Sequence, residues 1–204
     1  MAGIFTLTAL LFLFTGCSEG ARSVERTQTE GRPVATAADP SVVVTPTPDP
    51  RITGAVKIKC MAENLEVQEF RNARPSQDEI RIVRPDGTIL HSLRMPSVDD
   101  FQNFAPGPLT SRIDGFDFSV DWGSRIYHEV TFRFACNEAE LRLSTIKHST
   151  FDKHDPENDA KYTNRTIAVT PNLSIREVVV GDFLTLLYEK PKWSGKISEM
   201  KGSK

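Results

Sequence analysis

Apolar and polar residues alternate along much of the chain after residue 51, and this alternation predicts strands. Val56, Ile58 and Cys60 are separated by lysines, and the segment 116–122 has an apolar residue at every second position. A period of two places successive side chains on opposite faces of a strand, so that one face is apolar. We therefore expect a mainly β fold with little helix, an antiparallel meander that is sandwich-like or forms an open barrel.

The segment 116–146 has the clearest pattern and predicts a three-stranded meander. A loop of three residues, 123–125, would pair Phe118 with Val130 and keep the apolar faces of the first two strands together. A loop of two residues would place Phe118 opposite a glutamate, because a shift of one residue exchanges the faces of a strand. We therefore expect the three-residue loop.

Two other turns are indicated by their residues. A turn at Asn137–Glu138 would set Phe134 against Leu141. The sequence Pro85-Asp86-Gly87 follows an apolar run at 80–83 and predicts a hairpin. Proline presets the backbone of the first turn position, and glycine accepts the positive φ that such a turn requires.

The C-terminal half continues with less regular segments. Residues 149–165 are polar and predict a long surface loop. Apolar runs at 166–169 and 178–180 predict strands. Asp182 is a suitable capping residue for a short helix through Tyr188, although this run is apolar enough to form a strand.

The N-terminus begins with an apolar run of 12 residues, Ile4–Thr15, diluted only by threonines. A membrane-spanning helix needs about 20 apolar residues, so the run has the size of a signal-peptide core instead. It ends in Leu13-Phe14-Thr15-Gly16-Cys17, which resembles the lipobox of bacterial lipoproteins. The alternative is an ordinary secretory signal peptide followed by an incidental cysteine.

The resemblance to bacterial lipoproteins implies a location and an anchor. It implies that residues 1–16 are a signal peptide, that Cys17 carries the lipid, and that the mature protein faces the periplasm. In this class Ser18, directly after the cysteine, favours the outer membrane over the inner one. Two or three acyl chains give stable anchoring, so the expected anchor is lipid alone.

The chain then divides by composition. Residues 17–50 contain five prolines and no aromatic residue, which predicts a disordered tether that holds a folded body away from the membrane. Residues 51–189 form the predicted β-rich domain. From Lys190 onward five lysines face one glutamate, and we expect 190–204 to be a basic, flexible tail.

Two cysteines remain in the body, Cys60 and Cys136, each at an inward position of a predicted strand. In an oxidising compartment such a pair is expected to form a disulfide. Two buried thiols are the alternative. No CxxC motif or nearby set of cysteine and histidine indicates zinc.

Charge and motifs exclude several functions. The net charge of −2 offers no electrostatic basis for nucleic-acid binding, and the mean hydropathy of −0.31 excludes a protein with several membrane spans. No GxSxG, HExxH or phosphate-binding glycine loop is present. His128 lies on an apolar strand face and is expected to be a core or edge histidine. We expect no enzyme and no cofactor.

Two sets of polar residues are the remaining site candidates. A loop with two histidines and four acids is a weak candidate for a divalent metal, and a solvated loop is the simpler interpretation; its members are His148, Asp152, His154, Asp155, Glu157 and Asp159. The outer face of the meander carries acids beside a tyrosine and is a candidate for binding a partner; its members are Asp117, Ser119, Asp121, Tyr127 and Glu129.

These observations predict an envelope-anchored lipoprotein that acts as a non-enzymatic protein-binding module. A periplasmic inhibitor or toxin-immunity factor is the narrower form of this hypothesis. The alternative is a structural or assembly subunit of an envelope or secretion complex. In both cases the expected partners are the membrane, through the N-terminal lipid, and a protein of the envelope.

Overall fold

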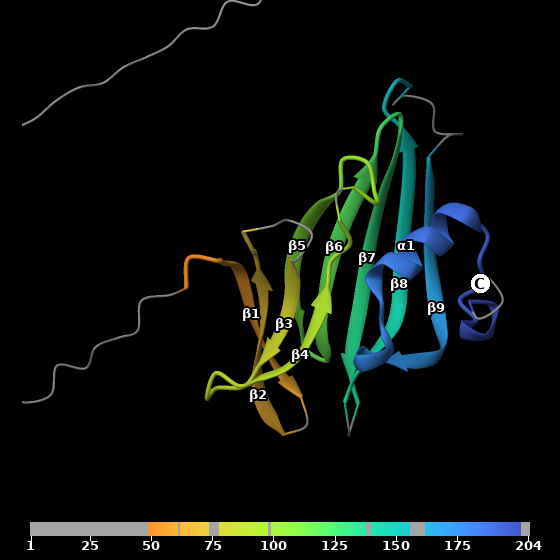
Figure 1. Ribbon diagram of the computed structural model, residues 1–204. Helices are drawn as coiled ribbons and strands as arrows, with labels where there is room; N and C mark the ends of the chain where they lie inside the picture. Colours follow the sequence, from red (N-terminus) through yellow and green to blue (C-terminus); the bar gives the residue numbers. More distant parts are fainter. Residues whose placement is uncertain are drawn as a thin grey trace, which may run out of the picture. The chain divides into compact units, whose positions relative to one another are not determined.

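The computed structural model describes residues 49–60, 62–73, 78–97, 99–137, 140–155 and 162–200. They form two antiparallel sheets and one α-helix (Figure 1). The mainly β fold with little helix is therefore confirmed. The predicted signal peptide, Cys17 and all but the last two residues of the predicted tether lie outside the described residues.

Each sheet is a meander in which every strand pairs with its neighbours in the chain. The first sheet has four strands, β1 (Ile52–Cys60), β2 (Glu63–Phe70), β3 (Glu79–Val83) and β4 (Ile89–Arg94). The second has five, β5 (Ala105–Arg112), β6 (Gly115–Gly123), β7 (Ile126–Cys136), β8 (Leu141–Asp152) and β9 (Thr163–Ser174). The predicted hairpin at 80–90 is confirmed as β3 and β4, with Gly87 at a φ of 87° in the turn.

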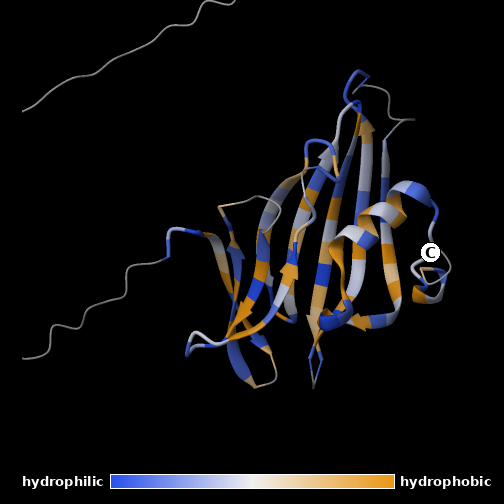
Figure 2. Ribbon diagram, in the orientation of Figure 1, coloured by the Kyte–Doolittle hydropathy of each residue, from blue (hydrophilic) through white to orange (hydrophobic). Residues whose placement is uncertain are grey.

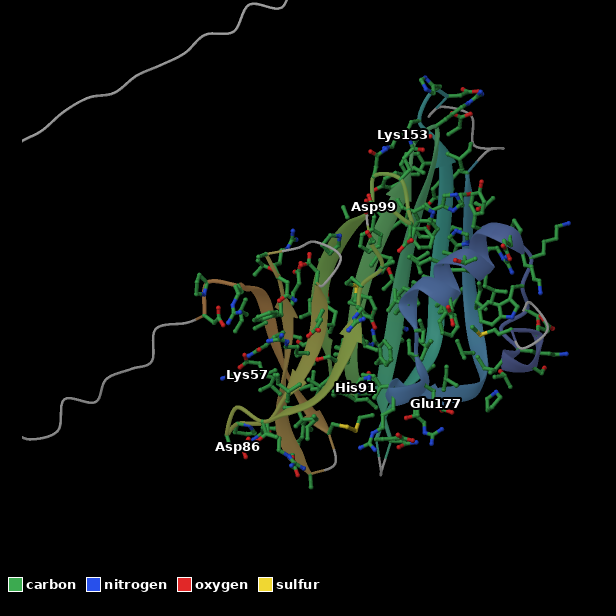
Figure 3. The ribbon with its side chains drawn as sticks, viewed as in Figure 1. Lys57, Asp86, His91, Asp99, Lys153 and Glu177 are labelled. Carbon is green, nitrogen blue, oxygen red and sulfur yellow. A yellow bond between two sulfur atoms is a disulfide. The ribbon has the colours of Figure 1, made fainter. Side chains whose placement is uncertain are left out.

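The two sheets are joined covalently. Cys60, the last residue of β1, forms a disulfide with Cys136, the last residue of β7, and their Cα atoms are 5.6 Å apart. Figure 3 shows this bond in yellow. The expected disulfide is thus confirmed, and it is compatible with an oxidising extracellular compartment. Within the described part of the chain, no helix is long and apolar enough to cross a membrane.

The core follows from the alternation of the strands, which Figure 2 shows as alternating colours along β6 and β7. Residues of β6 are buried at every second position. Four phenylalanine rings of β6 and β7 are at most 1% exposed; they are Phe116, Phe118, Phe132 and Phe134. Across the two strands these rings stack in pairs with centroids 5.0 and 5.1 Å apart. Apolar residues of both sheets and of the helix contribute to one buried cluster.

The register of the central hairpin differs from the expected one by two residues. Phe118 lies opposite Phe132 rather than Val130, and Phe134 lies opposite Leu143 rather than Leu141. The faces were predicted correctly, because a shift of two residues leaves every side chain on its own side of the sheet. In the β6–β7 hairpin Gly123 continues β6 and pairs with Tyr127, so the three residues between the paired positions are 124–126 and not 123–125. Between β7 and β8, Cys136 pairs with Leu141, so this turn is two residues longer than expected.

The helix α1 (Val180–Glu189) crosses one face of the five-stranded sheet (Figure 1). Its apolar residues follow helical spacing, and five of them are buried; they are Val180, Phe183, Leu184, Leu186 and Leu187. The ring of Phe183 meets that of Phe132 edge-on at 6.1 Å. The prediction of a strand at 178–180 was therefore wrong. The helix predicted through Tyr188 is present. Asp182 lies in the first turn of the helix, whereas the N-cap residue is Val179.

Two further boundaries differ from the sequence prediction. β8 continues through Asp152 and β9 begins at Thr163, so most of the polar run at 149–165 that is described is strand and not loop. Residues 190–200, expected to be a flexible tail, pack on the domain. Trp193 is only 2% exposed, because its ring contacts Phe183 at 5.9 Å and anchors the segment.

The packing of this last segment depends on a glycine. The backbone N–H of Thr170 donates to the carbonyl of Gly195 at 2.9 Å, which attaches the segment to β9. Gly195 has a φ of 93°, and a Cβ there would lie 2.0 Å from the carbonyl oxygen of Ala168. Only glycine fits so close an approach.

Candidate functional site

A pocket of about 1080 Å³ opens between the tip of the β6–β7 hairpin, the segment between β4 and β5, and α1. We name it the hairpin–helix pocket. Its volume is at the upper end of the range for ligand-binding pockets. The lining residues are Arg94–Ser97, Asp100–Gln102, Trp122–Ile126, His128, Val179, Gly181, Thr185 and Tyr188.

Hydrogen bonds fix the hairpin tip to the segment between β4 and β5. The backbone N–H of Gly123 donates to the carbonyl of Gln102 at 2.7 Å, and the side-chain amide of Asn103 donates to the carbonyl of Gly123 at 3.0 Å. Gly123 has a φ of 114°, and a Cβ there would lie 2.1 Å from the carbonyl oxygen of Ile126. The glycine therefore allows the two strands of the hairpin to approach closely at its tip.

An aromatic stack forms the inner wall of the pocket. The rings of Trp122 and His128 are parallel, with centroids 4.7 Å apart, and His148 continues the stack behind His128 at 5.4 Å. Phe101 meets Trp122 edge-on at 5.8 Å, and the ring of Tyr188 lies 5.9 Å from that of His128. Such ring pairs contribute stabilisation beyond their buried area, so we expect the side chains of this wall to be held in one conformation.

The two histidines of the stack are also hydrogen-bonded, His128 Nδ1 to His148 Nε2, at 3.1 Å. His128 is 8% exposed, which agrees with the core or edge position expected from the sequence. Burial lowers the pKa of His148 to about 4, with smaller contributions from the charges of His128 and Arg165. Burial also lowers the pKa of His128. The pair is therefore neutral at pH 7, and it adds no positive charge to the pocket wall.

The buried pair should make the protein sensitive to acid. The pKa of His148 is about 4 in the folded state and about 6.5 in the unfolded chain. The unfolded chain therefore binds more protons within this window, and acidification from pH 6.5 to 4 should lower the free energy of unfolding by about 3 kcal/mol. Urea denaturation at several pH values measures this slope.

The matched variant for this prediction is His148→Gln, which should flatten the slope between pH 4 and 6.5. His154→Gln, on an exposed turn, is the surface control. A slope in His148→Gln as steep as that of the wild type would contradict the assignment to the buried pair.

Several polar side chains of the pocket lack a partner within the protein. Among the described residues, the side chains of Arg94, Gln102 and Tyr188 make no hydrogen bond or ion pair. Arg125 is different, because its Nε lies 3.2 Å from a carboxylate oxygen of the buried Asp152. The pocket thus presents polar groups that are available to a ligand, on a mainly apolar surface.

Three large apolar side chains at the pocket are exposed, among exposed polar ones, and we name these three its apolar rim. Six large hydrophobic side chains are strongly exposed in the described part of the chain, and three of them belong to this pocket. Ile126 is 46% exposed, Val179 55% and Tyr188 66%. Exposed apolar residues that gather around a hollow are typical of an interaction site, whereas single ones need no explanation.

The outer face proposed from the sequence lies on the side of β6 and β7 away from the phenylalanine core. Its residues are largely engaged with neighbours on the same face. Asp117 forms an ion pair with Arg133 at 3.1 Å, and Ser119 is hydrogen-bonded to Thr131 at 2.9 Å. Tyr127 packs on Phe151.

The remaining two acids of this face lie across from each other. Asp121 pairs in register with Glu129, which is exposed. Burial raises the pKa of Tyr127, and so does a hydrogen bond with Asp121. The structure therefore brings all five predicted residues onto one surface, but most of their polar groups have partners within it.

The structure does not gather the described residues of the weak metal candidate into one site, although the backbone N–H of Asp155 donates to the carbonyl of Asp152 at 3.1 Å. His148 points into the core, and Asp152 is buried beside Arg125. His154 is exposed, and the backbone N–H of this residue donates to Asp152 at 3.0 Å. Glu157 and Asp159 lie outside the described residues. No group of three histidine, cysteine or acidic side chains suited to a metal occurs within the described ranges.

Of the residues that line the pocket, the sequence had singled out only His128. The walls come from three segments far apart in the chain, 94–102, 122–128 and 179–188, and none of them contains a motif. The exposed apolar residues gave no signal either, because exposure follows from the fold. No family model matches the chain, and neither the curated proteins nor the solved structures contain a match.

Proposed function

We propose that this protein is an envelope-anchored lipoprotein that acts as a non-enzymatic protein-binding module, and that the hairpin–helix pocket is its binding site. The observation that carries the proposal is the apolar rim formed by Ile126, Val179 and Tyr188 around a hollow. The lipobox-like sequence ending at Cys17 and the disulfide between Cys60 and Cys136 support the location.

The exposure of the rim favours a protein over a small molecule. A small-molecule pocket buries most of its ligand, and its apolar side chains lie inside. Here Val179 and Tyr188 are more than half exposed, so a small ligand in the hollow would leave apolar surface in water. A convex protein surface would cover the rim while one of its side chains fills the hollow, as anchors do in protein interfaces.

A pocket-filling substitution tests the proposal. Thr185 lines the pocket from α1 and is exposed, so Thr185→Trp should occupy the hollow and abolish partner binding without removing core contacts. The measurement is capture of a partner from envelope extract by the full mature chain, followed by mass spectrometry. We expect a stoichiometric partner with the wild type. The variant should bind this partner about 100-fold more weakly or worse, because the tryptophan takes the place of one interface anchor.

Thr166→Trp is the matched control, because Thr166 is exposed on β9 and adjoins buried Ile167 on the opposite face. Capture by both the wild type and Thr166→Trp, together with loss in Thr185→Trp, would support the pocket as the binding site. Equal capture by all three proteins would contradict it. Capture that fails only with Thr166→Trp would transfer the proposed site to the outer face.

A further inference from the structure

Arg94 is a cationic side chain of the pocket that is available to a ligand. It is the last residue of β4, is exposed and lines the pocket. Glu79 of the neighbouring strand β3 lies opposite Arg94 in the sheet, but the carboxylate of Glu79 accepts a hydrogen bond from Arg81 at 2.9 Å. Within the described part of the chain, the guanidinium of Arg94 thus has no carboxylate partner.

Two other polar side chains of the pocket can add hydrogen bonds to a ligand. Gln102 and Tyr188 can each donate a hydrogen bond and have no partner for their side chains among the described residues. Asp100 is the one carboxylate among the lining residues, and it accepts a hydrogen bond from the backbone N–H of Ser97 at 3.2 Å. Since Arg125 is already paired with Asp152, Arg94 is the one cationic side chain among the described lining residues that has no carboxylate partner.

We infer that the partner segment that enters the hairpin–helix pocket carries an acidic side chain beside a bulky apolar one. The apolar side chain fills the hollow within the rim, and the carboxylate binds the guanidinium of Arg94. A planar guanidinium can donate two parallel hydrogen bonds to one carboxylate, which gives orientation as well as attraction. This inference rests on the proposed function, because it specifies the chemistry of the segment that the pocket receives.

Two blocked peptides test the charge of this segment. Both are pentapeptides with acetylated and amidated ends and a central tryptophan; glutamates flank the tryptophan in one and glutamines in the other. Binding to the full ¹⁵N-labelled chain is followed by chemical-shift titration at low salt, where electrostatic attraction is screened least. We expect shifts at Gly123, Ile126 and Thr185 with both peptides, and about fivefold tighter binding of the acidic one.

Substitutions of Arg94 assign this preference to one residue. Arg94→Gln should remove the preference, so that the two peptides bind equally, whereas Arg94→Lys should keep part of the preference. Arg84→Gln is the matched control, because Arg84 is exposed in the β3–β4 turn and is paired with Glu63. Circular dichroism verifies that the three variants are folded.

The outcomes separate this inference from the proposed function. Equal binding of the two peptides, or a preference that survives in Arg94→Gln, would overturn the acidic segment and leave the pocket as an apolar binding site. A glutamine peptide with a free C-terminal carboxylate is the last probe. If it binds more tightly than the acidic peptide, the pocket receives the C-terminus of the partner, and the inference that an acidic side chain enters is overturned. No shift at the pocket with any peptide would contradict the proposed function itself.

Discussion

Replacing Cys60 and Cys136 together with alanine is expected to lower the free energy of unfolding by about 4–5 kcal/mol. The two cysteines are 76 positions apart in the chain, and the entropy that a cross-link removes from the unfolded chain increases with the length of the closed loop. The bond also joins β1 of one sheet to β7 of the other. Urea denaturation of the double variant and the wild type measures the loss.

Reduction provides the control for this prediction. Dithiothreitol should destabilise the wild type by a similar amount and leave the Cys60→Ala, Cys136→Ala variant unchanged, because that variant has no bond to reduce. A loss below about 1 kcal/mol in both experiments would show that the two sheets are held together by packing alone.

Phe132→Ala is the second change with a large expected effect, a loss of about 3–5 kcal/mol. The ring is 0% exposed, stacks on Phe118 at 5.0 Å and meets Phe183 of α1 edge-on. Its removal leaves a cavity between the sheet and the helix that the surrounding side chains fill only in part. Urea denaturation gives the free energy, and hydrogen exchange of the α1 amides reports whether the helix loosens.

Phe151→Ala is the matched control for the core substitution. Phe151 lies on the outer face of β8, is only partly buried and packs on Tyr127. Its removal opens no closed cavity, so we expect a loss of about 1 kcal/mol. Equal losses in the two variants would contradict the central position of Phe132 in the core.

The alternation of residues predicted the faces of the strands but not their register. A pattern with a period of two is unchanged when one strand moves by two residues, so the pairings of Phe118 with Phe132 and with Val130 were equally compatible with it. The backbone at Gly123 decided between them. The same local pattern could not locate the ends of β8 and β9, because exposed polar residues in an outer strand resemble those of a loop.

The disulfide was predictable because the predicted β domain contains two cysteines, each at an inward position of a strand. The burial of Trp193 was not, since a lysine-rich segment ordinarily remains in solvent, and its attachment combines the ring of Phe183 with a close approach of Gly195 to β9. The pocket was the least predictable feature. Its apolar rim consists of residues whose exposure is decided by the position of α1 on the sheet, and a sequence does not encode that position in any motif.

The order of the strands has a consequence for how the chain matures. Because every strand pairs with one that precedes or follows it directly, a chain that emerges from its N-terminus can add each strand to the one before it, except β1 and β5, which begin the two sheets. The bond between Cys60 and Cys136 does not follow this order. The thiol of Cys60 therefore waits until β2 to β7 have emerged, so the bond forms only once the whole first sheet and three strands of the second are present.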